Sequence, residues 1–290
     1  MPIELNRFSK NLSYELTAPI QNIVVDLQEI AEIDKLAEIK QKQSGKKALY
    51  YFLGLVASVV VIFIIPIFAV VIILVVLGLI IVFIRELITW FKFSKLNISN
   101  YRYEVAKQIL QMLDRDIEKT ADVELQLSFQ PIDKKEYKTT TMPHPDKSGW
   151  KIDNHEHVWL KIQGQFLDKT RFQLTANGLS KRQYGWKRSS SGKSKHKSKT
   201  KSRGLDISLI LNYSQRRYRS VKILENEISD AVKLPATSYM RGVKVTDKEM
   251  HLVVRVASQM AENKEEIYQT IAMMFLSLYQ VLNLAKKLAK

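Results

Sequence analysis

The chain has 290 residues, no cysteine and a formal net charge of +16 at neutral pH. The missing cysteine excludes disulfides, thiol nucleophiles and cysteine-bound metals, and the length favours one or two domains. The positive charge is concentrated, because residues 181–222 hold 14 Lys or Arg and Asp206 as their only acid. Such a local excess indicates a local anionic partner.

Residues 1–47 are expected to form an N-terminal region with one amphipathic helix. Residues 1–18 show no clear periodicity, whereas from Pro19 apolar residues recur at helical spacing to about Gln43. Gly45 is expected to end this helix. Its apolar stripe either packs on the chain's own soluble domain or forms a homo-oligomer through a short coiled coil.

Residues 48–84 carry no charge and are almost entirely apolar, with Pro66 near the middle. About 18 such residues suggest one membrane span, and this run is about twice as long. A proline disrupts a helix interior. We therefore predict a membrane hairpin over 48–93 with arms at about 49–65 and 67–84, the alternative being a single kinked span.

Basic residues flank the run on both sides, which places both flanks and both termini in the cytoplasm by the positive-inside rule. The predicted anchor is marked by Leu49, Pro66, Ile84 and the interfacial Trp90. Because no ionisable side chain lies within the run, it is expected to be a passive anchor and not a transport path.

Residues 97–290 are expected to form a cytosolic α+β domain, so the whole chain is predicted to be an α+β membrane protein. Apolar spacing predicts a helix over 101–120 and another from about 263 to the C-terminus. The latter covers the sheet or, alternatively, lies in the membrane interface. Period-two alternation predicts an antiparallel sheet of roughly five to seven strands, with 133–154 as a loop and 218–223 as a further strand.

A Lys- and Ser-rich segment, 187–203, lies between two predicted strands and has no acid. It cannot bury apolar area, so it is expected to be a disordered basic loop. The candidate anion-binding residues are Lys181, Arg182, Lys187, Arg188, Lys193, Lys195, Lys197, Lys199, Lys201, Arg203, Arg216, Arg217 and Arg219.

Three interpretations of this basic segment remain open. It is a functionless solvated insertion, it binds anionic membrane lipid or an acidic protein, or it binds nucleic acid with the rings of Tyr184, Trp186, Tyr213 and Tyr218 stacking on bases. Tethering to a membrane raises the local concentration of lipid, which favours the second interpretation. Phosphorylation of its serines would then weaken the attraction.

The remaining motifs in the sequence indicate no catalytic, nucleotide-binding or metal-binding site. The sequence around Gly192-Lys193-Ser194 lacks the first glycine of a phosphate-binding loop. His155 and His157 have no evident distant partner for a metal. No cofactor site or catalytic motif is recognised. We therefore expect a non-enzymatic membrane-anchored scaffold or tether, with a nucleic-acid-binding protein as the second hypothesis and an enzyme of unknown reaction as the third.

Overall fold

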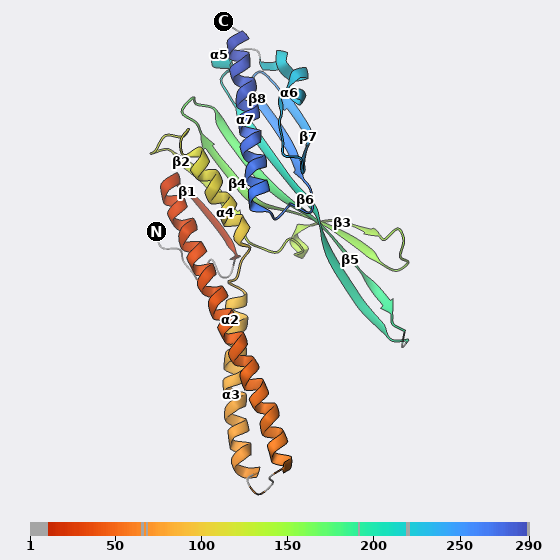
Figure 1. Ribbon diagram of the computed structural model, residues 1–290. Coiled ribbons are helices and arrows are strands. Elements are labelled where there is room, and N and C mark those ends of the chain that lie inside the picture. Colours follow the sequence, from red (N-terminus) through yellow and green to blue (C-terminus); the bar gives the residue numbers. More distant parts are fainter. Residues whose placement is uncertain (1–10, 65–66, 68, 191, 219–220, 289–290) are drawn as a thin grey trace. The chain divides into compact units, whose positions relative to one another are not determined.

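The computed structural model describes residues 11–64, 67, 69–190, 192–218 and 221–288. The chain divides into two compact units: a sheet unit, Met1–Leu27 with Tyr101–Lys290, and a helical unit, Gln28–Asn100. The architecture is α+β, with one large antiparallel sheet and several helices (Figure 1). We describe each unit by itself.

The helical unit consists of most of α2 (Ile20–Ile64) and all of α3 (Ala69–Ser94). Both helices are long and apolar enough to cross a membrane. Their large apolar side chains are exposed, for example Val70 at 74% and Ile81 at 69%. Contiguous exposed apolar surface of this extent is typical of a membrane or protein interface.

Helix α2 does not end near Gly45, contrary to the prediction, but continues to Ile64. A Cβ at Gly45 would lie 3.3 Å from the indole of Trp90 on α3, so the glycine makes room for that ring. Leu49 and Ile84 are exposed as expected of an anchor. Pro66, the predicted turn, lies outside the described residues.

Within the helical unit, buried positions on α2 recur at intervals of three, four or seven residues: Ile30, Asp34, Ala37, Ser44 and Ala48. This spacing is the seam of a coiled coil. The apolar stripe that a homo-oligomer would need is therefore covered within the chain, and self-association stays a prediction.

Side-chain contacts hold α2 and the segment around α3 together. Gln41 accepts a hydrogen bond of 2.8 Å from the amide of Asn97, and the rings of Phe52 and Phe83 lie 6.3 Å apart. Gly54 lies against Leu79, to which a Cβ at Gly54 would make an ordinary contact at 3.7 Å. The two arms thus approach each other at a small residue.

The sheet unit is built on an eight-stranded antiparallel sheet in the order β1-β2-β4-β5-β6-β8-β7, with β3 paired to β4. The strands are β1 (Ser13–Pro19), β2 (Asp122–Ser128), β3 (Lys138–Pro143), β4 (Lys151–Gln165), β5 (Arg171–Arg188), β6 (Ser194–Asn212), β7 (Ser238–Val245) and β8 (Glu249–Val256). Two of them were not predicted: β1 falls in the segment without periodicity, and β3 in the expected loop.

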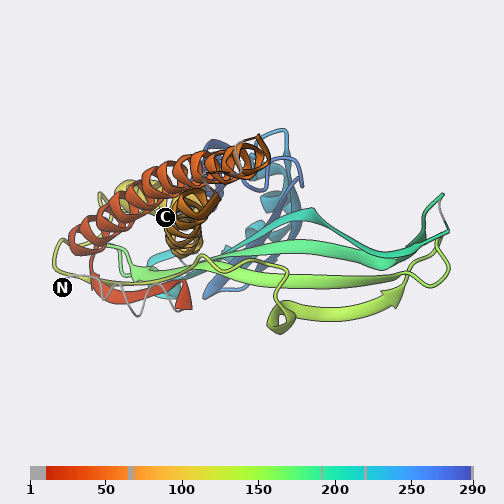
Figure 2. The same ribbon diagram turned by 90° about the horizontal axis from the view of Figure 1, so that it is seen from below.

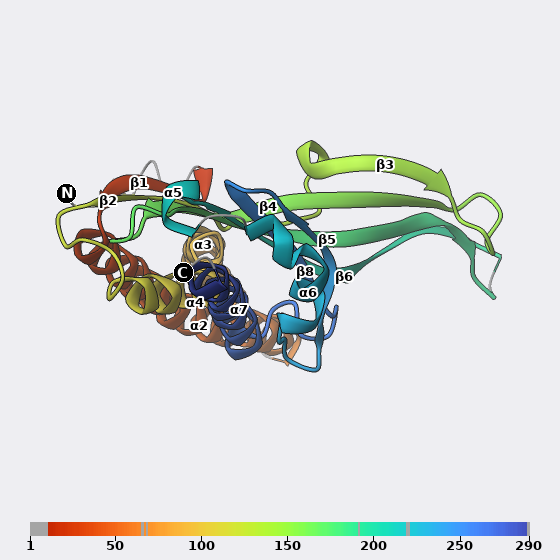
Figure 3. The same cartoon turned by 90° about the horizontal axis from the view of Figure 1, so that it is seen from above.

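Helices α4 (Asn100–Leu113) and α7 (Lys264–Leu288) cover one face of the sheet (Figure 3). Phe275 of α7 packs edge-on against Phe172 of β5, with ring centroids 5.8 Å apart. Half of the most apolar stretch of α7 is buried, which agrees with a helix that covers the sheet. By length and composition alone, α7 is also long and apolar enough to cross a membrane. The other face of the sheet is polar.

Short helices replace the strand predicted at 218–223: α5 (Gln215–Tyr218), η3 (Val221–Leu224) and α6 (Glu225–Ala231), while η2 (Lys135–Tyr137) precedes β3. Tyr218, Val221 and Leu224 are buried, and their spacing of three is helical instead of alternating. Residues 219 and 220 lie outside the described residues.

Strands β5 and β6 are the longest of the sheet and continue past the helices as a two-stranded ribbon, with β4 and β3 alongside part of it (Figure 2). We call Ser180–Arg188 with Ser194–Ser202 the ribbon. This extension carries most of the basic residues singled out in the sequence.

Candidate functional site: a basic β-ribbon

The described residues of the segment 187–203 form paired strands and a turn, not the disordered loop expected from its composition. Its residues pair with β5 in continuous register from Arg188↔Ser194 to Ser180↔Ser202. Backbone hydrogen bonds between strands require no apolar side chains, so a strand already anchored in the sheet can template a polar partner. The sequence signal was present as Lys alternating with Ser, His or Thr at period two.

Register places the lysines of β6 on a single face of the ribbon. Lys201 lies opposite Lys181, Lys199 opposite Gln183, and Lys195 opposite Lys187. Since directly opposite residues share a face and successive residues alternate, six lysines project to one side. We call this set the lysine face: Lys181, Lys187, Lys195, Lys197, Lys199 and Lys201.

The lysine face concentrates unbalanced charge. None of its members forms an ion pair with a carboxylate of the described residues. Two pairs, Lys181 with Lys201 and Lys187 with Lys195, place like charges directly opposite one another, which destabilises a strand pair. An anion bound over this face would remove the repulsion.

The opposite face of the ribbon carries rings and hydroxyl groups. Trp186 lies opposite His196, and their rings make an edge-on contact with centroids 5.6 Å apart. Tyr184 and Arg182 lie on the same side by alternation, and Trp186 is 66% exposed. Register therefore separates two of the predicted stacking rings from the lysines.

One indole does lie on the lysine side. A Cβ at Gly185, which faces Lys197, would lie 2.6 Å from the ring of Trp150, so this ring fills the space above the glycine. The ammonium of Lys147 lies 4.7 Å from the same ring centroid. Trp150 is thus packed against the backbone of the ribbon and beside a cation, and is not an open stacking surface.

The outer edge of β6 is free of a strand partner along the ribbon, because β8 pairs only with Leu205–Asn212. Gly204 marks the change: its φ is +110°, and a Cβ would lie 2.5 Å from the carbonyl oxygen of Val256. Only glycine fits this position. Next to it, Arg203 donates a hydrogen bond of 3.2 Å to Asn154 on β4.

Several predicted residues do not join the lysine face. Arg182 and Arg188 lie on β5 at positions of the opposite face, and Lys193 lies in the turn. Arg216 and Arg217 belong to α5, beyond the other end of β6, where Arg217 contacts the ring of Tyr218. Arg219 lies outside the described residues.

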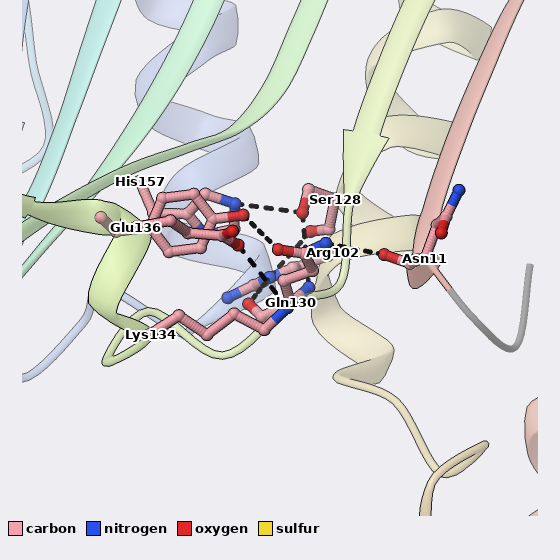
Figure 4. A network of polar contacts seen from close by, with 8 residues as sticks. Asn11, Arg102, Ser128, Gln130, Lys134, Glu136 and His157 are labelled. Carbon is pink, nitrogen blue, oxygen red and sulfur yellow. Dashed lines mark hydrogen bonds and ion pairs between the residues drawn. The ribbon is translucent and has the colours of Figure 1, made fainter.

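A polar network lies near the base of the ribbon, on the helix-covered face (Figure 4). Arg102 of α4 donates two hydrogen bonds, of 2.7 and 3.0 Å, to the carbonyl oxygens of Ser128 and Gln130. His157 Nε2 lies 3.0 Å from Ser128 Oγ, and its ring stacks on Tyr137 at 4.0 Å. Burial and then the charge of Arg102 lower the pKa of His157 to about 4.

His155 and His157 both lie buried on one side of β4. Across the described residues, no group of three or more His, Asp or Glu side chains could hold a metal ion. Asp153, on the same side, instead accepts a hydrogen bond of 2.6 Å from Thr141 of β3. These groups fix strand pairing around the base of the ribbon.

Sequence reasoning missed Arg102 and Trp150, because their roles depend on strands and helices distant in sequence. Comparison with known proteins adds no assignment: no protein-family model, no curated protein and no solved structure matches this chain. Its function therefore has to be argued from the helical unit and the basic ribbon themselves.

Proposed function

We propose that this chain is a non-enzymatic membrane-anchored tether whose lysine face binds anionic lipid headgroups. In this proposal α2 and α3 form a hairpin in the bilayer, with both termini on the cytoplasmic side. The observation that carries it is the register of β5 and β6, which gathers six lysines without ion-pairing carboxylates on one side of an exposed ribbon. An acidic protein surface is the alternative occupant.

Energetics support a lipid surface as the partner. Each Lys near an anionic leaflet contributes about 1 kcal/mol, so the six lysines together contribute up to about 6 kcal/mol. A chain that is itself anchored in the membrane meets such a surface at high local concentration. The exposed apolar surfaces of α2 and α3 support that anchoring.

Nucleic acid fits the ribbon less well. Binding of single strands combines a basic groove with aromatic rings along the same path. Here Tyr184 and Trp186 lie on the face opposite the lysines, and Trp150 is packed against Gly185. Tyr213 and Tyr218, the other two predicted rings, are buried at the far end of β6.

The test uses the full chain in nanodiscs of zwitterionic or anionic lipid. Because the chain has no cysteine, Ser190→Cys at the ribbon turn carries one environment-sensitive dye without background. We expect the dye to report contact with anionic lipid at low salt and loss of contact at high salt. No difference between the two lipids would refute the proposal.

Two charge-matched variants separate the effect of the lysine face from the effect of the total charge. The first replaces Lys195, Lys197, Lys199 and Lys201 by Gln, and the second replaces His196, Ser198, Thr200 and Ser202 by Glu. Both lower the net charge equally on the same strand, but on opposite faces. We expect only the first to abolish lipid contact. Equal loss in both would show that the arrangement on one face is irrelevant.

The same proteins in zwitterionic nanodiscs are titrated with single- and double-stranded nucleic acid across a salt series. Binding to nucleic acid that exceeds binding to anionic lipid at equal ionic strength would replace this proposal by the nucleic-acid alternative. Binding to neither would leave the ribbon without an anionic partner and refute both.

A further inference from the structure

A cavity of about 210 Å³ lies within the sheet unit between the start of α4 and strands β4, β5 and β6. It is far larger than the roughly 30 Å³ occupied by one water molecule. Its wall includes Arg102 of α4, Ser180 of β5 and the exposed Glu262 before α7, so it reaches the surface. Neither the lysine face nor the helical unit contributes a residue to it.

Arg102 brings a desolvated positive charge to this cavity. The side chain is 7% exposed, and its guanidinium lies 5.7 Å from the ring of Trp159 and 5.8 Å from that of Tyr101. Nη1 and Nε are hydrogen-bonded to carbonyl and phenol oxygens. Among the described residues, Nη2 makes no hydrogen bond and no carboxylate forms an ion pair with Arg102. A buried cation is normally paired with a carboxylate, whereas the guanidinium of Arg102 contacts carbonyl oxygens, a phenol oxygen and aromatic rings.

Unpartnered polar atoms line the same cavity. The hydroxyl of Ser180 and Nδ1 of His157 are both buried without a hydrogen-bond partner among the described residues. Ser202 lies directly opposite Ser180, and Thr200 follows on the same face of β6. Buried hydroxyl and imidazole groups without partners are rare in folded proteins and require an explanation.

Tyr101 and Arg102, which line the cavity, belong to the first turn of α4, where the helix dipole has its positive end. A helix N-terminus, a guanidinium and several hydroxyl groups together form the donor set that proteins use for oxyanions. His157 is neutral near pH 7, because burial lowers its pKa to about 4. Its Nε2 is hydrogen-bonded to the hydroxyl of Ser128, and its Nδ1 is a buried polar atom without a partner among the described residues.

We infer that this cavity is a binding site for a phosphate-sized oxyanion, held by Arg102 and the hydroxyl of Ser180. The ligand is either inorganic phosphate or the phosphomonoester of a larger molecule such as a lipid headgroup. The site stands on residues outside the lysine face, so this inference does not depend on the proposed function.

The experiment measures thermal unfolding of the full chain in uncharged detergent with increasing inorganic phosphate, at ionic strength held constant with chloride. We expect a saturable rise in Tm for the wild type. Glycerol phosphate, the soluble analogue of a lipid phosphomonoester, distinguishes the two sources: a tighter response to it than to inorganic phosphate assigns the headgroup. No saturable response to either would overturn the inference.

Ser180→Ala separates a binding role from a structural one. Removing a buried hydroxyl that has no partner leaves Tm without phosphate unchanged or higher. Losing a hydrogen bond to a charged ligand weakens phosphate binding about tenfold or more. Glu262→Gln removes a negative charge at the rim and is expected to tighten binding.

The variant with Gln at the four β6 lysines is the control for non-specific attraction. It is expected to keep the saturable response to phosphate, because its substitutions lie on the other face of β6. If that variant loses the response, or if Ser180→Ala and Glu262→Gln both bind phosphate like the wild type, the site is not where we place it.

Discussion

Lys187 of β5 lies directly opposite Lys195 of β6, and these two ammonium groups share one face of an exposed strand pair. Such a pair opposes folding. We expect Lys195→Glu to stabilise the sheet unit by roughly 0.2–1 kcal/mol, since it converts a like-charge pair to an opposite-charge pair. Chemical denaturation of the full chain in detergent measures the change, and high salt should remove it.

Lys197→Glu provides the matched control for this change. Lys197 lies opposite Gly185, so the new carboxylate has no cation directly opposite it. It alters the charge of the lysine face by the same amount with a smaller gain in stability. Both variants should bind anionic lipid more weakly. A loss of stability in Lys195→Glu would show that the lysine pair is not repulsive.

Gly204 is the position at which β6 leaves β8 and enters the ribbon. We expect Gly204→Ala to lower the free energy of unfolding by roughly 1–3 kcal/mol, because φ is +110° and the new Cβ would collide with the carbonyl oxygen of Val256. Gly242→Ala, with nothing near its Cβ position and no positive φ, is the control. Equal effects of the two would contradict the requirement for glycine at position 204.

His157 gives the sheet unit a pH dependence with a defined sign. Its pKa falls from 6.5 to about 4 on folding, first because it is buried and then because of Arg102. Between these values the unfolded chain binds the proton and the folded chain does not, so stability falls as the pH drops from 6.5 towards 4. The slope from this group is at most about 1.4 kcal/mol per pH unit.

Unfolding free energies measured from pH 7.5 down to pH 4 check this contribution. His157→Gln should flatten the slope in that window. An unchanged slope in His157→Gln would show that other groups carry the acid sensitivity.

The hairpin topology is tested by single cysteines at Gln43 and Ser94, which lie on α2 and α3. If the chain returns to the side it came from, an impermeant thiol reagent labels both positions from the same side of a sealed vesicle. Labelling from opposite sides would refute the hairpin and favour one kinked span. The absence of native cysteine removes background.

Much of the fold follows from periodicity in the sequence. Helix α7 and the inner parts of β4, β5, β6 and β8 carry strong apolar patterns, because each buries one face against the other. Where an element depends on partners distant in the sequence, periodicity does not predict it. Strand β1 pairs with β2 more than a hundred residues later, and Gly45 lies in a helix interior because Trp90 needs the space.

The basic segment was expected to be a disordered loop, but its described residues form two paired strands. Counting charges over a window discards their alternation, and alternation is what assigns Lys195 to Lys201 to one face. Prediction from charge alone also grouped Arg216 with the ribbon, although β6 runs its whole length between them. The cavity beside Arg102 had no sequence signal, since its walls come from four separate elements.

Which face of the ribbon carries the lysines depends on the order of residues in β6 and not on their composition. Deleting Ser202, at the base of the β6 half of the ribbon, would exchange the faces of the β6 residues between it and the turn while leaving the net charge untouched. The pairing with β5 would still form, but lysine and hydroxyl groups would change places. Two sequences that differ by one serine and carry the same charge would then expose opposite faces of the ribbon.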